Sequence, residues 1–132
     1  MEKILHNYEL VLLSPPSTTE DVINASFTKL TETIESYEGT LLIKDEWGKI
    51  RLAYEINKQR TAKFFLLEFV GPSSLPLELE RLIRIDNNFL RFLTVRLEEN
   101  VSEADLEGLK AGASNRALLR KEKISTLKQE NV

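Results

Sequence analysis

The chain has 132 residues, of which 42% are hydrophobic and 30% are charged, and its net charge at pH 7 is −3. This composition fits one globular domain with a short appendage, and the acidic balance argues against a strongly basic, indiscriminate nucleic-acid binder. The sequence contains no cysteine, which excludes disulfides, and no apolar run nears the roughly 20 residues of a membrane helix. The N-terminus lacks a secretory cleavage pattern and the composition of a transit peptide, so an intracellular location is predicted.

The first third of the chain predicts a strand followed by a helix. The strand covers residues 5–13, and the segment SPPST then breaks the chain, because proline lacks a backbone donor. A helix is predicted over residues 19–37, with Ser17 or Thr18 as its N-cap and Gly39 as its stop. Its apolar side chains recur at helical spacing and form one stripe: Ile23, Phe27, Leu30 and Ile34.

The stretch WGKIRLAYEINK, residues 47–58, has a period of two, which is the mark of a half-buried strand. Its apolar side is predicted to pack on the helices and consists of Ile50, Leu52, Tyr54 and Ile56. A glycine inside a strand pattern often marks a bulge, so the strand is expected to be irregular at Trp47-Gly48. The remaining predicted elements are, in order, the whole strand 40–56, a polar loop 57–61, a strand 62–70, a helix 76–85 and a strand 89–98.

The order β-α-β-β-α-β is that of the split βαβ, ferredoxin-like arrangement, an α+β fold. It predicts a four-stranded antiparallel sheet with both helices on one face and no internal cover on the other face. The second and fourth strands are expected at the edges, where backbone groups lack partners. Residues 1–101 are predicted to form this domain, and residues 102–132 a charged tail that is partly helical or becomes ordered on a partner.

Catalytic residues are not apparent in this sequence. The single histidine, His6, has no carboxylates at ligand spacing around it, so a structural role is predicted and no metal site. Glu32, Glu35 and Glu38 share a helix face, which we interpret as a solvated acidic surface. No glycine-rich phosphate loop occurs, and the single histidine and absent cysteine make a nucleophile–base set hard to assemble.

Cationic side chains are concentrated in the middle of the chain. Up to Gly39 there are two cations against seven acids, whereas between Lys44 and Arg96 there are ten cations against seven acids. A basic surface is therefore predicted there. The strand KFFLLEF is aromatic, like the RNA-binding strand of RRM domains, but it lacks the glycine and cation placements of their pattern. Its three phenylalanines are accordingly predicted to be mostly core.

The stretch WGKIRLAYEINK closely resembles the G-x-R-x-L-A-Y-x-I-x-K signature of a bacterial small-subunit ribosomal protein family, S-six (S6). Asn7-Tyr8-Glu9 stands where that family opens with Arg-Tyr-Glu. AKFFLLEF is similar to its third strand, and LERLIRIDNNFLRFLTVR to its second helix, turn and last strand. The resemblance covers roughly residues 5 to 98 and implies the same ferredoxin-like fold.

The resemblance implies a structural role in the small ribosomal subunit. The protein would bind the central domain of small-subunit rRNA together with ribosomal protein S-eighteen (S18), without catalysis or cofactor and without a membrane. Arg51, Tyr54 and Lys58 lie on the signature, and Arg84 and Arg91 match basic positions further on. The full set of candidate RNA- or partner-binding residues is Arg51, Tyr54, Lys58, Arg60, Lys63, Arg84, Arg91 and Arg96.

Three departures from the family pattern reduce the positive charge expected on the RNA-binding surface. Asn7 replaces the usual arginine, and Asp86 and Leu90 occupy positions that are often basic. Fewer phosphate contacts imply weaker, less salt-dependent RNA binding by the isolated protein, and hence more dependence on the protein partner. A ferredoxin-like ligand-sensing module and an enzyme of the same fold are the alternatives, since a fold alone does not specify function.

Overall fold

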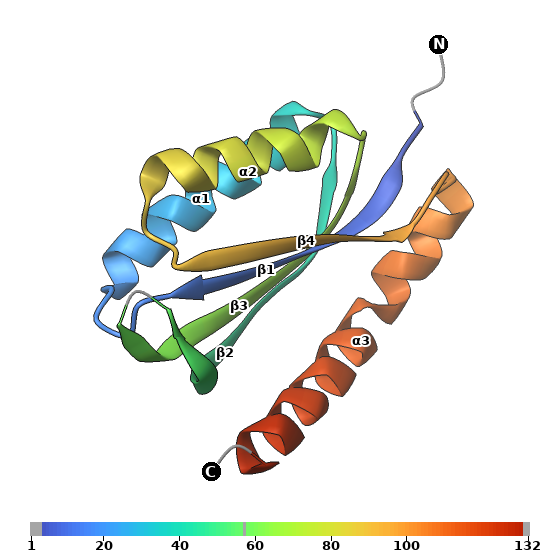
Figure 1. Ribbon diagram of the computed structural model, residues 1–132. Helices are drawn as coiled ribbons and strands as arrows, with labels where there is room; N and C mark the ends of the chain where they lie inside the picture. The colour runs from blue at the N-terminus through green and yellow to red at the C-terminus, as the bar shows by residue number, and fades with distance from the viewer. Residues whose placement is uncertain (1–3, 57, 131–132) are drawn as a thin grey trace.

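The computed structural model describes residues 4–56 and 58–130. Figure 1 shows an antiparallel sheet with α1 and α2 on one face and a third helix, α3, on the other. The strands follow the order β2-β3-β1-β4, which confirms the ferredoxin-like prediction and places β2 and β4 at the edges. The elements are β1 (His6–Ser14), α1 (Glu20–Ser36), β2 (Thr40–Ile56), β3 (Gln59–Gly71), α2 (Ser74–Asp86), β4 (Arg91–Glu98) and α3 (Glu103–Glu130).

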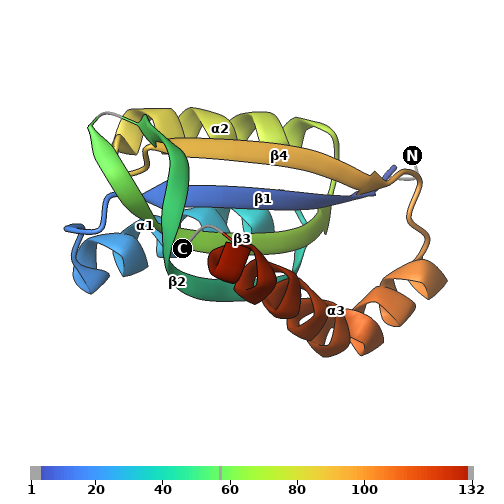
Figure 2. The same cartoon turned by 60° about the horizontal axis from the view of Figure 1, so that its bottom comes forward.

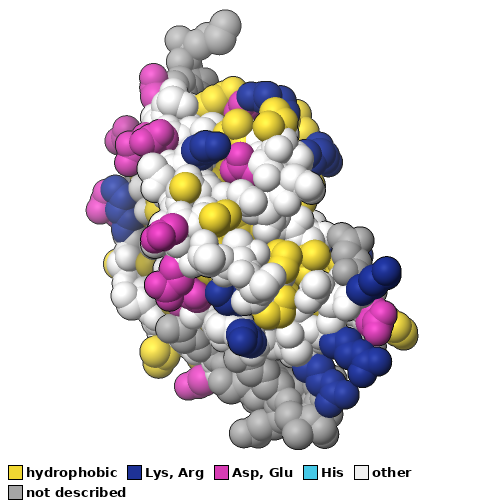
Figure 3. Space-filling model, turned by 90° about the vertical axis from the view of Figure 1, so that its left-hand side faces the viewer, with side chains coloured by type: hydrophobic (Ala, Val, Ile, Leu, Met, Phe, Trp, Pro, Cys, Tyr) yellow, Lys and Arg dark blue, Asp and Glu magenta, His cyan; other side chains and the backbone are white. Residues whose placement is uncertain are grey.

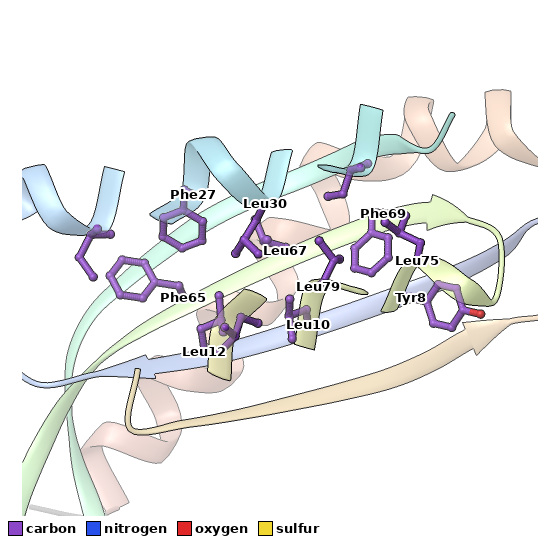
Figure 4. Packing of buried hydrophobic residues seen from close by; sticks show 13 residues of the cluster. Tyr8, Leu10, Leu12, Phe27, Leu30, Phe65, Leu67, Phe69, Leu75 and Leu79 are labelled. Carbon is purple, nitrogen blue, oxygen red and sulfur yellow. The ribbon is translucent and has the colours of Figure 1, made fainter. Parts of the chain in front are cut away.

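The hydrophobic core lies between the sheet and the two helices α1 and α2 (Figure 4). The central strands β1 and β3 pair antiparallel, with Tyr8 opposite Phe69, Leu10 opposite Leu67 and Leu12 opposite Phe65. Successive side chains of a strand point to opposite faces, so these pairs share the face that the helices cover. The stripe predicted for α1 is buried against them: Ile23, Phe27, Leu30 and Ile34.

The two helices begin and end for local reasons. Thr19, one residue after the predicted positions, caps α1 by accepting a hydrogen bond from the Val22 N–H. Helix α2 begins at Ser74, two residues earlier than predicted, because Pro76 lies in the first turn, where backbone N–H groups have no intrahelical acceptor. Asn87 then ends α2 in the left-handed conformation, with φ of 54°.

The β2–β3 hairpin is tighter than the sequence indicated. Residues 57–61 were predicted as a loop, but β3 already begins at Gln59, which pairs with Ile56. Lys58 has a φ of 66°, a left-handed conformation that permits so short a turn. Of the two cations in this segment, Arg60 therefore lies on β3 and Lys58 lies in the turn.

The prediction that Ile50, Leu52, Tyr54 and Ile56 pack on the helices was wrong for Ile50 and Tyr54. Ile50 pairs with Ala62, on the face turned away from α1 and α2, and Tyr54 is 85% exposed. The register of β2 against β3 shifts between Leu41 and Ile43, between Glu46 and Gly48 and between Arg51 and Ile56. The first two shifts each add one residue to β2 and each exchange its two faces, so together they restore the facing that the strand has at Leu41. The irregularity predicted at Trp47-Gly48 is confirmed, and Gly48 has a φ of 75°.

The sheet face predicted to be bare is partly covered by α3 (Figure 2). The helix runs without interruption through Gly108 and Gly112, although glycine is a poor helix former. Its start is a reciprocal cap, because the Ser102 N–H donates to Asp105 and the Asp105 N–H donates to the Ser102 hydroxyl. These bonds lower the pKa of Asp105, so the cap is strongest above the ordinary carboxyl pKa and weakens as the pH falls through the lowered value.

Candidate nucleic-acid and partner interface

The tip of the β2–β3 hairpin presents four of the predicted site residues. Arg51 and Lys58 are exposed, and Tyr54 is the most exposed large hydrophobic residue among those described. Arg60 donates from Nε to Oε1 of Glu55 at 3.2 Å, with both side chains largely in solvent. Exposed ion pairs of this kind contribute little to stability, so Arg60 can exchange its partner.

Lys63 does not belong to this exposed group. Its Nζ donates a hydrogen bond to the backbone carbonyl of Thr18 at 2.8 Å, and the side chain is partly buried. This bond joins the start of β3 to the loop that enters α1. Lys63 therefore links β3 to this loop through one of its three ammonium N–H groups.

Arg84 and Arg91 are brought together where α2 turns into β4. They line a hollow of about 340 Å³, together with Ile83, Asn87, Phe89, Leu90 and Phe92. The Arg84 guanidinium lies over the Phe92 ring, 5.2 Å from its centroid, which holds the cation at the rim. Glu80 approaches Arg84 only to 3.8 Å in an exposed pair, a weak competitor for an external anion.

The hairpin and the α2–β4 turn lie at the same end of the sheet. Leu13, near the end of β1, pairs with Arg91 of β4, and the adjacent Ser14 pairs with Lys63 of β3. Figure 3 looks onto this end and shows a group of Lys and Arg side chains beside patches of hydrophobic atoms. The basic surface predicted from the middle of the sequence is thus divided between these two places.

Arg96 lies away from this group. Arg96 lies on β4 and pairs with Tyr8, near the opposite end of the sheet. Its guanidinium lies 5.7 Å from the Tyr8 ring centroid and donates to Glu99 at 3.1 Å. The hydrogen bond to Glu99, followed by that to Tyr8, raises the pKa of Arg96. The structure therefore separates Arg96 from the other predicted site residues.

The departures from the family pattern have structural explanations. Asp86 forms a 3.1 Å ion pair with Lys29 and so joins α2 to α1. The acidic residue therefore adds a negative charge, and it also engages the positive charge of Lys29. Leu90 donates its N–H to the Leu13 carbonyl at 2.7 Å and lines the hollow beside Arg91. Asn7 is buried in β1. At these three positions the fold therefore has the reduced positive charge that the sequence predicts.

An apolar strip that the sequence did not single out runs along β1 and β4. Val11 pairs with Leu93, and Val95 pairs with Glu9, on the face turned away from α1 and α2. Leu93 is 60% exposed and Val95 39% exposed. Since α3 leaves these side chains open, this part of the sheet can contact another molecule through apolar surface. The signal was the alternation of β4, whose outward residues are as apolar as its inward ones.

A second unpredicted feature is a group of two carboxylates and two guanidinium groups. Glu68 of β3 is fully buried, and it binds Arg116 and Arg120 of α3. Arg120 also binds Glu9 of β1 at 3.0 Å. The sequence signal was the spacing of four residues between Arg116 and Arg120, which puts both on one helix face.

The single histidine has a structural contact in the fold. His6 accepts a 3.2 Å hydrogen bond at Nδ1 from the Asn100 N–H, which is the structural role predicted for it. Over residues 4–56 and 58–130, no group of three potential metal ligands occurs. In the same ranges, no helix is both long and apolar enough to span a membrane.

Comparison with known proteins agrees with the resemblance of the signature stretch. The family model described as ribosomal protein S6 matches residues 7–96. The small ribosomal subunit protein bS6 of Desulfatibacillum aliphaticivorans is 37% identical over 106 residues, which are 80% of this chain and 56% of that protein. The bS6 protein of Moorella thermoacetica is 37% identical over 98 residues, 74% of this chain and 100% of that protein.

A solved structure shares the fold. The 30S ribosomal protein S6 of Thermotoga maritima superposes with a TM-score of 0.64 at 22% identity, over 83% of this chain and 98% of that one. The signature stretch, the order of strands and the match over residues 7–96 agree with one another. The chain belongs to the ribosomal protein S6 family.

Proposed function

We propose that this protein is a structural constituent of the small ribosomal subunit and binds the central domain of small-subunit rRNA together with ribosomal protein S18. Membership of the S6 family supports the ribosomal role, and in a bacterium the location is then the cytoplasmic ribosome. The observation that carries RNA binding is the pairing of Arg84 and Arg91 around one hollow, beside the exposed cations of the hairpin.

This arrangement suits a folded RNA better than a small molecule. Guanidinium groups bind phosphate oxygens through two parallel N–H donors, and they do so without regard to base sequence. Arg84 and Arg91 are exposed at the rim of a shallow surface, and Arg51 and Lys58 extend the positive charge along the same end. A ligand that spans both places must be extended and negatively charged, which is a property of an RNA backbone.

The apolar strip of β1 and β4 supports a protein partner beside the RNA. Leu93 and Val95 are exposed on the strip, and β4 is an edge strand of the sheet. An edge strand can pair its backbone with a strand from another chain, and the strip can bury apolar side chains of that chain. With Lys63 and Lys29 occupied within the fold, we infer that RNA affinity depends on this partner.

The double variant Arg84→Ala/Arg91→Ala is expected to weaken the complex with rRNA and S18 by about tenfold or more, because two charge-assisted phosphate contacts are lost. A gel-shift titration on a central-domain rRNA fragment measures this, with this protein alone, with S18 alone and with both. The slope of log affinity against log salt concentration should also become less steep, by about two.

Arg81→Ala is the matched control for this titration. Arg81 lies on α2 near Arg84 and is exposed, but its guanidinium is paired with Glu78 and does not line the hollow. We expect its affinity and salt slope to match those of the unmodified protein. Equal binding by the double variant and the control would contradict the RNA surface, and no shift with both proteins present would contradict the proposed function.

The ligand-sensing alternative lacks a supporting observation. A second surface hollow, of about 380 Å³, is lined by Ile4, Ser36, Tyr37, Pro72 and Ser74, and no charged side chain converges on it. A regulatory ligand site needs a few convergent polar groups in an enclosed pocket. The relatives are named as ribosomal proteins, which favours a structural role over an enzyme of the same fold.

A further inference from the structure

Two carboxylates lie side by side on the sheet face turned away from α1 and α2. Glu9 of β1 and Glu68 of β3 are directly opposite each other in the antiparallel pairing. Like charges at such positions repel each other. Glu68 is also fully buried, and a buried carboxylate is costly unless cations and hydrogen bonds compensate it. The pair therefore requires positive charge from another segment.

Helix α3 supplies that charge through two arginines one turn apart. Arg116 donates to both carboxylate oxygens of Glu68, from Nε to Oε1 at 3.2 Å and from Nη2 to Oε2. Arg120 donates from Nη2 to Glu68 Oε1 at 2.7 Å, and its Nε lies 3.0 Å from Glu9 Oε1. A planar guanidinium matches a carboxylate with two donors, which an ammonium group cannot do. The Glu9–Glu68 pair is thus a receptor for arginine side chains.

Helix α3 lies against β2, but it buries little apolar surface there. Between Glu103 and Arg120 none of its side chains is fully buried: Leu106, Leu109, Ala113 and Ala117, on the side of the two arginines, are half-buried, and Leu118 and Leu119 are more than half exposed. Burial of apolar side chains usually provides most of the stability of a docked helix. Over this part of α3 the arginine contacts are therefore the strongest attachment.

We propose that α3 is an exchangeable internal cover: it occupies the Glu9–Glu68 pair through Arg116 and Arg120, and a protein partner that presents arginines to the same pair displaces it. Val95 is opposite Glu9 in the pairing of β1 with β4, so the carboxylate pair is continuous with the apolar strip that α3 leaves open. A partner segment that carries arginines beside apolar side chains fits both surfaces at once. This inference rests on the proposed protein partner. It adds that α3 regulates when this face of the sheet is accessible.

The test uses the full chain and a labelled synthetic peptide of residues 102–130, which has the sequence of α3. In the unmodified protein, the tethered helix competes with the peptide. In the variant Arg116→Gln/Arg120→Gln, the tethered helix loses its attachment, so the peptide should bind at least about tenfold more tightly, as fluorescence anisotropy would measure. A peptide with both arginines replaced by glutamine should not bind the variant.

Lys110→Gln is the matched protein control, because Lys110 lies on α3 and, among the side chains that the structure describes, pairs with Glu107 of the same helix and not with the sheet. It should bind the peptide as weakly as the unmodified protein does. Equal peptide binding by the unmodified protein and the double variant, or binding by neither, overturns the proposal. Neither rRNA nor S18 enters this experiment, so its failure is distinguishable from failure of the proposed function.

Hydrogen exchange of the unmodified protein tests the same point without any substitution. If α3 detaches while the sheet stays folded, its amides exchange at least about a hundredfold faster than those of β1 and β3. Addition of excess unlabelled peptide of residues 102–130 should accelerate exchange in the tethered helix further. Exchange of α3 at the same rate as β3 would mean that the helix leaves only on global unfolding, and the proposal would be wrong.

Discussion

Phe27→Ala is expected to lower the free energy of unfolding by about 3–5 kcal/mol, the range for truncating a fully packed aromatic residue. Phe27 is 2% exposed on α1, and its ring centroid lies 5.1 Å from that of Phe65 and 6.2 Å from that of Phe89. It therefore joins three parts of the fold, namely α1, the sheet and the turn into β4. Alanine leaves a cavity that none of these elements can close without moving the others.

Urea unfolding followed by the fluorescence of Trp47 would measure this loss. Trp47 is the only tryptophan, and it stacks on Phe64 of the sheet with ring centroids 4.7 Å apart. Val22→Ala is the control, because Val22 lies on the same helix but is 38% exposed. We expect the control to change stability by less than about 0.5 kcal/mol. Similar losses for the two variants would contradict the placement of the core between α1 and β3.

The main elements could be predicted because their signals are local. The stripe of α1 repeats at helical spacing from Ile23 to Ile34, and every member of it is buried. The order of strands follows from β-α-β-β-α-β, since few topologies connect those elements without crossing. These features depend on periodicity within one element, so each can be read without knowing what the element packs against.

The facing of residues 50–56 could not be predicted, because alternation shows that a strand has two faces but not which of them the helices cover. The register of β2 also shifts at three places, near Leu42, at Trp47 and between Arg51 and Ile56. Only the shift at Trp47 had a sequence signal, in Gly48. The consequence for the candidate site is that Tyr54, interpreted as mainly a core residue, is exposed beside the hairpin cations.

The charged groups were harder to assign than the elements. Lys63 and Arg60 looked alike in the sequence, but Lys63 meets a backbone carbonyl 45 residues away in the chain and Arg60 remains in solvent. The contact between Arg116 and Glu68 likewise joins residues 48 apart. Such partners are determined by tertiary packing, so charge and spacing alone identify the candidate residues but not their roles.

Glu68→Leu is expected to leave the free energy of unfolding unchanged or to raise it by about 1–4 kcal/mol, since an apolar side chain of similar volume often replaces a buried ion pair without loss. Ile43 of β2 is opposite Glu68 and is itself buried, so a leucine at this position has an apolar neighbour. Arg120 keeps Glu9, and Arg116 is partly exposed and can turn its guanidinium to water. The expected loss is confined to the docking of α3.

Comparison with Arg116→Gln/Arg120→Gln separates the two roles of this group. Glu68→Leu weakens the attachment of α3 and the arginine variant removes it, so both should accelerate hydrogen exchange in that helix. Only the arginine variant retains the Glu68 carboxylate without its cations, so we expect only that variant to lose stability. A loss of more than about 2 kcal/mol in Glu68→Leu would mean that the ion pairs hold the sheet itself together. Unchanged stability with a freed helix would instead mean that Glu68 is retained for binding arginine, because the fold does not need it.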